Sequence, residues 1–147
     1  MKYSQAKQGR IFVIRLEDGD IIHEQIEKLA KIESIQAAFL TIIGGADKDS
    51  TVVVGPEDGR SKTITPFEHT LDDVHEVVGT GTIFPNEKGE PILHMHIASG
   101  RQTSTITGCV RKGVKTWHIL EIILIELIGV TAKRSLDSTT GFELLNP

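Results

Sequence analysis

The chain of 147 residues is long enough for one hydrophobic core and too short for two, which predicts a single domain over residues 1–147. Its formal net charge of −4, without a run of lysines and arginines, argues against direct nucleic-acid binding, and its single cysteine excludes an internal disulfide. Residues 1–9 lack the apolar stretch of a secretory signal, and the longest apolar run, residues 119–130, is shorter than the roughly 20 residues of a membrane span. We therefore expect a cytoplasmic protein without a membrane partner.

The first predicted elements are a strand and a helix. Residues 10–17 are apolar and β-branched, and the Asp-Gly-Asp turn that follows ends a strand. We expect Asp20 to cap a helix over residues 21–33, because apolar residues recur at helical spacing from Ile22 onward. The apolar face of this helix should lie on a sheet.

Several strands are predicted next. Residues 36–43 and 51–54 are extended segments that end at glycines, and residues 61–70 are expected to include further extended structure. Residues 74–84 and 92–98 flank a turn and should pair as a hairpin.

The second half of the chain contains the most apolar segment. Residues 105–110 are extended, and residues 115–128 form a long strand that is apolar on both faces. Such a strand is covered on both sides, so with one helix available the second cover is expected from another sheet layer and from another subunit. Residues 142–145 are predicted to form a short final strand. The fold class is α+β, a mostly antiparallel sheet with one main helix packed on it.

A His-Met-His segment supplies the first candidate ligands. Because side chains alternate along a strand, Leu93, Met95 and Ile97 are expected to face the core, and His94 and His96 to point together from the opposite face. Two imidazoles at this spacing can bind one metal ion. The alternative is a strand with two incidental histidines.

Cys109 is the third candidate ligand. A hairpin turn within residues 100–105 places His96 opposite Cys109, and directly opposed residues share a face of the sheet. Two imidazoles and a thiolate suit zinc, with iron, nickel or cobalt as alternatives, and leave a fourth position for water, a substrate or a residue of a neighbouring chain. Cys109 as a small buried apolar residue is the competing interpretation.

Two glutamates are candidates for proton transfer. Glu121 interrupts an apolar strand, so it is expected either to pair with Arg134 or Arg15, or to serve the metal site as an outer acceptor or a general base. Glu76, on the strand that contains Gly79 and Gly81, has the same two possible roles, in an ion pair or at the metal site.

Several segments together resemble the plant- and prokaryote-conserved (PPC) domain family. In the order of that family they are residues 10–16, Gly44-Gly45, residues 76–79, residues 93–96, Gly108-Cys109, and Arg134, Asp137 and residues 140–142. The resemblance implies an α+β subunit that assembles into a homotrimer, with its long strands at the subunit contacts. In many bacterial and archaeal members the position of Cys109 is a histidine. Plant members carry AT-hook segments that bind DNA, and this chain has no Arg-Gly-Arg-Pro hook.

The sequence thus predicts a protein that binds a zinc-like metal ion through His94, His96 and Cys109, with a protein partner or a small-molecule ligand at the metal, and the family resemblance implies that it is a homotrimer. One alternative is a metal-dependent hydrolase or lyase that uses the open coordination position. Another is a DNA-associated regulatory or interaction module in which a different factor contacts the DNA.

Overall fold

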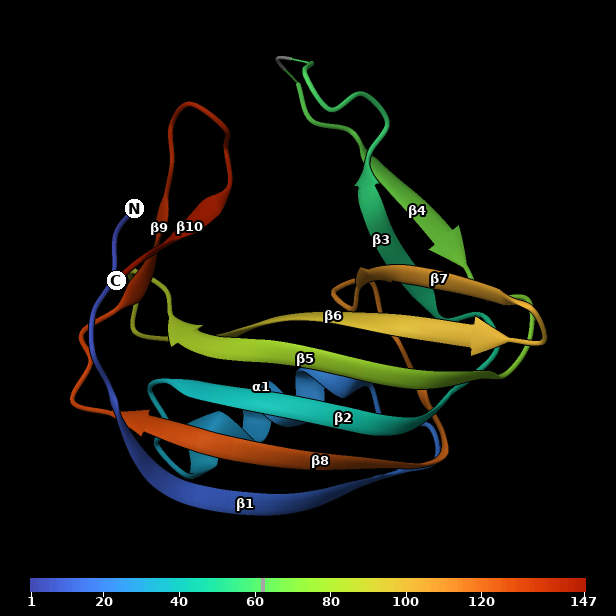
Figure 1. Ribbon diagram of the computed structural model, residues 1–147, viewed down its shortest axis with the longest axis horizontal. Helices are drawn as coiled ribbons and strands as arrows, with labels where there is room; N and C mark the ends of the chain where they lie inside the picture. The colour runs from blue at the N-terminus through green and yellow to red at the C-terminus, as the bar shows by residue number, and fades with distance from the viewer. Residues whose placement is uncertain (62) are drawn as a thin grey trace.

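The computed structural model describes residues 1–61 and 63–147 and shows one large antiparallel sheet with a helix on one side (Figure 1). The sheet has eight strands in the order β1-β8-β2-β5-β6-β7-β3-β4, and β9 and β10 form a separate two-stranded sheet. The elements are β1 (Lys7–Glu17), α1 (Ile22–Ile32), β2 (Ala38–Ala46), β3 (Thr51–Pro56), β4 (Pro66–Thr70), β5 (His75–Pro85), β6 (Pro91–Arg101), β7 (Ser104–Cys109), β8 (Thr116–Ile128), β9 (Lys133–Leu136) and β10 (Glu143–Asn146).

The core lies between α1 and one face of the sheet. The helix buries Ile22, Ile26 and Ala30, which recur every four residues and therefore share one side of the helix. They belong to the same buried cluster as side chains from the central strands, among them Leu40 and Leu120. Each buried aliphatic side chain of this size stabilises the fold by roughly 1.5–3 kcal/mol. No helix in the described part of the chain is long and apolar enough to cross a membrane.

The predicted fold class is confirmed, and so are the main strands and their antiparallel pairing. The hairpin predicted from residues 74–84 and 92–98 is β5–β6. Of the segment over residues 61–70, β4 is extended, whereas Lys62 lies outside the described residues. β9, which was not predicted from the sequence, is an additional strand that pairs with the predicted final strand β10.

The predicted role of Asp20 as a helix cap is wrong. The residue at the cap position is Ile21, and it makes no side-chain capping hydrogen bond. The Asp20 carboxylate instead accepts a hydrogen bond from the backbone N–H of Glu17 at 2.9 Å, which closes the turn after β1. The backbone N–H of Ile22 donates to the carbonyl oxygen of Val114 at 3.0 Å, so this helix-end donor is satisfied by the backbone of another segment.

β8 is apolar on both faces, but in the described chain only one face is covered. Leu120, Ile122 and Leu124 are buried beneath α1, whereas Ile119 and Ile123 on the opposite face are 49% and 40% exposed. Eight of the described strands form one continuous sheet and the separate β9–β10 sheet lies beside β5, so the second sheet layer expected from the sequence does not cover β8 among the described residues. The outer face of β8 therefore has no cover within the part of the chain that the structure describes.

β3 and β7 approach each other closely at Gly108. A Cβ atom at this position would lie 2.8 Å from the carbonyl oxygen of Val53 and 2.9 Å from the Cβ atom of Val52. Both distances are shorter than a van der Waals contact, so only glycine fits without a displacement of β3. Gly108 thus fixes the approach of these strands beside Cys109.

We expect Gly108→Ala to lower the free energy of unfolding by roughly 1–3 kcal/mol, because the added methyl group forces the two strands apart. Gly59→Ala is the matched control, since a Cβ atom there meets nothing within 4 Å. Urea unfolding followed by circular dichroism measures both variants. Equal midpoints for the two variants would show that the close approach at Gly108 has no energetic consequence.

Candidate metal centre

β6 presents its two histidines on the face of the sheet opposite α1. Leu93, Met95 and Ile97 are all at most 1% exposed, whereas His94 and His96 are exposed. The alternation predicted from the sequence is therefore confirmed, and its cause is the burial of the three apolar side chains. The imidazole rings of the two histidines have centroids 5.1 Å apart and lie edge to face.

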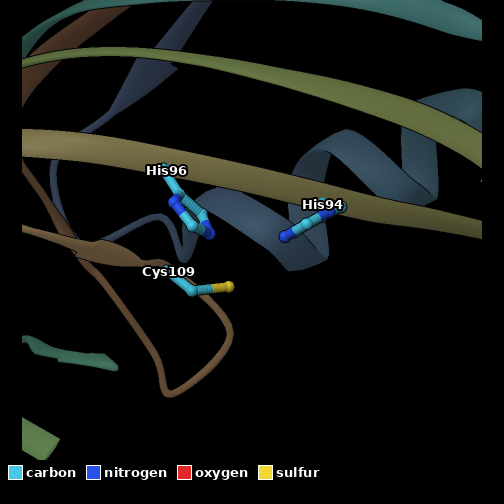
Figure 2. Close-up of side chains that lie close together, drawn as sticks. All are labelled: His94, His96 and Cys109. Atoms are coloured by element: carbon cyan, nitrogen blue, oxygen red, sulfur yellow. The ribbon is translucent and has the colours of Figure 1, made fainter. Parts of the chain in front are cut away.

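β7 brings Cys109 to the same face. In the register of β6 and β7, Cys109 lies directly opposite His96, as predicted. Figure 2 shows the side chains of His94, His96 and Cys109 converging on one space. Their potential ligand atoms all lie within 4.8 Å of one another, and no other group of three or more histidines, cysteines and acidic residues comes this close among the described residues.

The three side chains fit a tetrahedral metal ion. Zinc binds nitrogen at about 2.0–2.1 Å and sulfur at about 2.3 Å, which places tetrahedral ligand atoms roughly 3.3–3.7 Å apart. The largest separation between the potential ligand atoms exceeds this range by about 1 Å at most. Small χ rotations of the exposed imidazoles would remove this difference. Because three protein ligands would occupy three positions of a tetrahedral ion, one coordination position would remain open.

The surroundings of His94 favour the neutral imidazole that binds metals. Desolvation by the neighbouring protein lowers the pKa of His94 below its ordinary value, and the positive charge of Arg134 lowers it further. His96 and Arg111 contribute in the same direction. The lowered pKa keeps a nitrogen lone pair available at neutral pH, so protons compete less with a metal ion at this position.

Comparison with known proteins identifies the family. The family described as the Plants and Prokaryotes Conserved (PCC) domain matches residues 3–128. The chain belongs to this family. The match confirms the resemblance noted from the sequence, in which the same domain was called PPC.

Two solved structures resemble this PCC domain over its whole length. A metal-containing protein from Archaeoglobus fulgidus has a TM-score of 0.85 at 24% identity, with 100% of each chain covered. A plant- and prokaryote-conserved (PPC) protein from Pyrococcus horikoshii has a TM-score of 0.84 at 23% identity, with 100% of this chain and 98% of that chain covered. These likenesses show the fold.

One curated relative is a much longer protein. The bifunctional protein GlmU from Synechococcus sp. (strain JA-2-3B'a(2-13)) is 25% identical over 134 residues, which make up 90% of this chain. The PCC domain spans 19% of the length of that relative.

The β9–β10 hairpin places an arginine beside the three candidate ligands of the PCC domain. Arg134 on β9 is only 3% exposed, and its Nη2 atom donates a hydrogen bond to the hydroxyl of Thr82 at 3.1 Å. Thr82 lies directly opposite His94 in the β5–β6 register. From the sequence, Arg134 was expected to pair with Glu121 and was one of the residues that resemble the family, but its place beside the candidate ligands was not predicted, because the pairing of β9 with β10 was not predicted.

The two candidate glutamates lie apart from the three ligands. Glu121 on β8 is separated from β6 by β2 and β5, a distance of roughly 14 Å at the usual strand spacing. Glu76 is four residues along β5 from Thr80, the residue opposite His96, which corresponds to roughly 13 Å. The structure therefore does not bring Glu121 or Glu76 together with the three candidate metal ligands.

Neither predicted ion pair of Glu121 forms. Arg15 lies opposite Glu121 in the β1–β8 register, but its guanidinium group pairs with Glu17 at 2.6 Å. Arg134 is bonded to Thr82 instead. Glu121 makes no salt bridge to any residue that the structure describes.

Cobalt substitution should reveal the sulfur ligand. We expect the Co²⁺-loaded protein to show a near-ultraviolet thiolate-to-metal charge-transfer band, and Cys109→Ser to abolish it, because Cys109 is the only thiol in the chain. Absorption spectroscopy of the two proteins at equal metal content measures the band. A wild-type spectrum without the band would remove Cys109 from the ligand set.

Proposed function

We propose that this PCC domain binds one zinc-like divalent ion per chain through His94, His96 and Cys109. The observation that carries the proposal is the convergence of two imidazoles and a thiol, whose ligand atoms lie within 4.8 Å of one another on an exposed sheet face. A borderline-soft set of two nitrogens and one sulfur suits zinc. The metal-containing protein from Archaeoglobus fulgidus, which shares the fold, adds support.

The chain itself supports a binding role more strongly than a hydrolytic one. A zinc ion with an open position can act as a Lewis acid or activate a bound water molecule. A hydrolase or lyase would also need a group that moves protons, yet no carboxylate lies within the cluster of three candidate ligands among the described residues, and Glu143, which lines the adjoining cavity, is exposed to solvent. A bound ion would connect β6 to β7, and its free position would accept a small-molecule ligand.

The proposal includes assembly into a homotrimer, which the family resemblance implies. The metal ligands and the exposed apolar residues share one face of the sheet. A line of directly opposed residues across β1, β8, β2, β5 and β6 shows this: Val13, Ile123, Thr41, Thr80 and His96. On this face Val13 and Ile43 are 83% and 55% exposed. Burial of such side chains between copies of the chain would stabilise the assembly.

Direct nucleic-acid binding is not part of the proposal. The net charge of −4 opposes association with a phosphate backbone, whose recognition depends on clustered lysines and arginines. An interaction with another protein remains compatible with the exposed apolar face.

Elemental analysis by inductively coupled plasma mass spectrometry tests the metal centre. We expect about one zinc-like ion per wild-type chain purified without chelators, and at least tenfold less in the His94→Ala/His96→Ala variant, because two of three ligands are removed. His69→Ala is the matched histidine control on β4 and should retain the metal. Wild-type protein without metal would refute the proposal.

Light scattering coupled to size-exclusion chromatography tests the assembly. We expect a mass of three chains for the wild type and a shift to smaller species for Ile43→Glu, because a charge cannot be buried unpaired at an apolar contact. Ile32→Glu is the control, since Ile32 is equally apolar and 68% exposed on α1. A monomeric wild-type protein would contradict this part of the proposal.

A further inference from the structure

Arg134 is a buried cation without an anionic partner. The residue is 3% exposed, its Nε atom is buried without a hydrogen-bond partner, and no carboxylate forms a salt bridge with it among the described residues. Its only polar contact there is the hydrogen bond from Nη2 to Thr82. Buried charges in proteins are ordinarily paired, because removal of an ion from water is costly. The guanidinium group of Arg134 therefore has hydrogen-bond donors available for an anion.

A cavity of about 580 Å³ adjoins this guanidinium group and two of the metal ligands. This volume lies within the range of small-molecule sites, which is roughly 300–1,000 Å³. The cavity is lined by Arg134 together with His94 and Cys109, and its apolar wall includes Phe142 and Leu144 from the β10 end of the chain. It thus combines a cation, a candidate metal position and an apolar surface.

The charges around the cavity favour an anionic occupant. Arg111 also lines it, held by hydrogen bonds from its guanidinium group to the carbonyl oxygen of Leu93 at 3.2 and 3.3 Å. Lys112, a further lining residue, is already paired with Glu68 at 2.9 Å. A divalent ion bound by two neutral imidazoles and one thiolate would add a net positive charge. Arg134 and Arg111 would then face a cationic centre without compensation.

Contacts within the chain supply only part of this compensation. Glu143 lines the same cavity and its negative charge stabilises the charged form of Arg134, but it forms no salt bridge with Arg134 among the described residues. The guanidinium carbon of Arg134 lies 6.0 Å from the centroid of the Phe84 ring, the outer limit of a cation–π interaction. The negative charge of Glu143 would repel a doubly charged phosphate more strongly than a singly charged group. A singly charged, planar carboxylate matches one guanidinium edge and an apolar wall better.

We propose that the cavity binds a small organic carboxylate, whose carboxylate group pairs with Arg134 and whose apolar body packs on Phe142 and Leu144. The carboxylate could also occupy the open coordination position of the ion, and that part of the inference rests on the proposed metal centre. The pairing with Arg134 rests on the buried guanidinium group alone. The ligand class is therefore a monocarboxylate with a hydrophobic substituent.

Nuclear magnetic resonance titration with sodium benzoate tests the proposal. The probe is added to isotope-labelled, zinc-loaded protein, and the Arg134 Nε–H resonance is assigned by through-bond correlation to the Arg134 backbone in the wild-type protein. We expect benzoate to shift this resonance saturably, while benzamide, which is neutral and of the same shape, leaves it unchanged. Arg134→Lys should weaken benzoate binding at least about tenfold, because lysine cannot form the bidentate pair.

Arg101→Gln is the matched control. Arg101, at the end of β6, already pairs with Asp73, so this variant should bind benzoate as the wild type does. Equal shifts with benzoate and benzamide, or no shift with either, would overturn the proposal. This comparison uses wild-type protein and therefore decides the question even if Arg134→Lys does not fold.

Metal content measured on the same sample separates the two proposals. Zinc-loaded protein that does not bind benzoate would overturn the carboxylate site and leave the metal centre intact. Protein that binds no zinc but shows an Arg134-dependent benzoate shift would refute the metal centre and support the carboxylate site.

Discussion

The pairing of β6 with β7 is the constraint on which the candidate site depends. It sets His96 opposite Cys109, and a register shift of one residue would send Cys109 to the opposite face. Burial of Leu93, Met95 and Ile97 holds β6 in its orientation, because turning the strand over would expose three core side chains. At roughly 1.5–3 kcal/mol each, that exposure would cost about 5–9 kcal/mol. The hydrophobic core thus fixes the position of polar ligands that lie outside it.

The two faces of the sheet have different roles for the same reason. α1 covers one face of the sheet and buries the apolar side chains of the central strands. The other face is therefore free to present His94, His96 and Cys109. The glycine at position 108 lets β3 pack against β7 beside the cysteine. Farther along the chain, β9 carries Arg134 to Thr82, so a segment remote in sequence supplies the positive charge next to the candidate ligands.

The parts of the fold that depend on local periodicity were predictable from the sequence. The alternation of residues 93–97 and the polar turn after Gly100 were sufficient to place His96 opposite Cys109. Arg134 was not predictable in the same way, because the β9–β10 turn depends on hydrogen bonds from Thr140 to the Asp137 side chain within a polar segment. The cap predicted at Asp20 failed because its carboxylate closes the preceding turn. Contacts between distant segments, such as Arg134 with Thr82, leave no periodic signal.

X-ray absorption at the zinc K-edge tests the central claim of a site with two histidines and one cysteine most directly. We predict one sulfur scatterer at about 2.3 Å and two imidazole nitrogens at about 2.0–2.1 Å, together with one further light atom in the open position. The imidazole ligands should also give the outer-shell scattering of their ring carbons. A first shell of oxygen and nitrogen alone, without sulfur, would contradict the account, because it would place the metal away from Cys109.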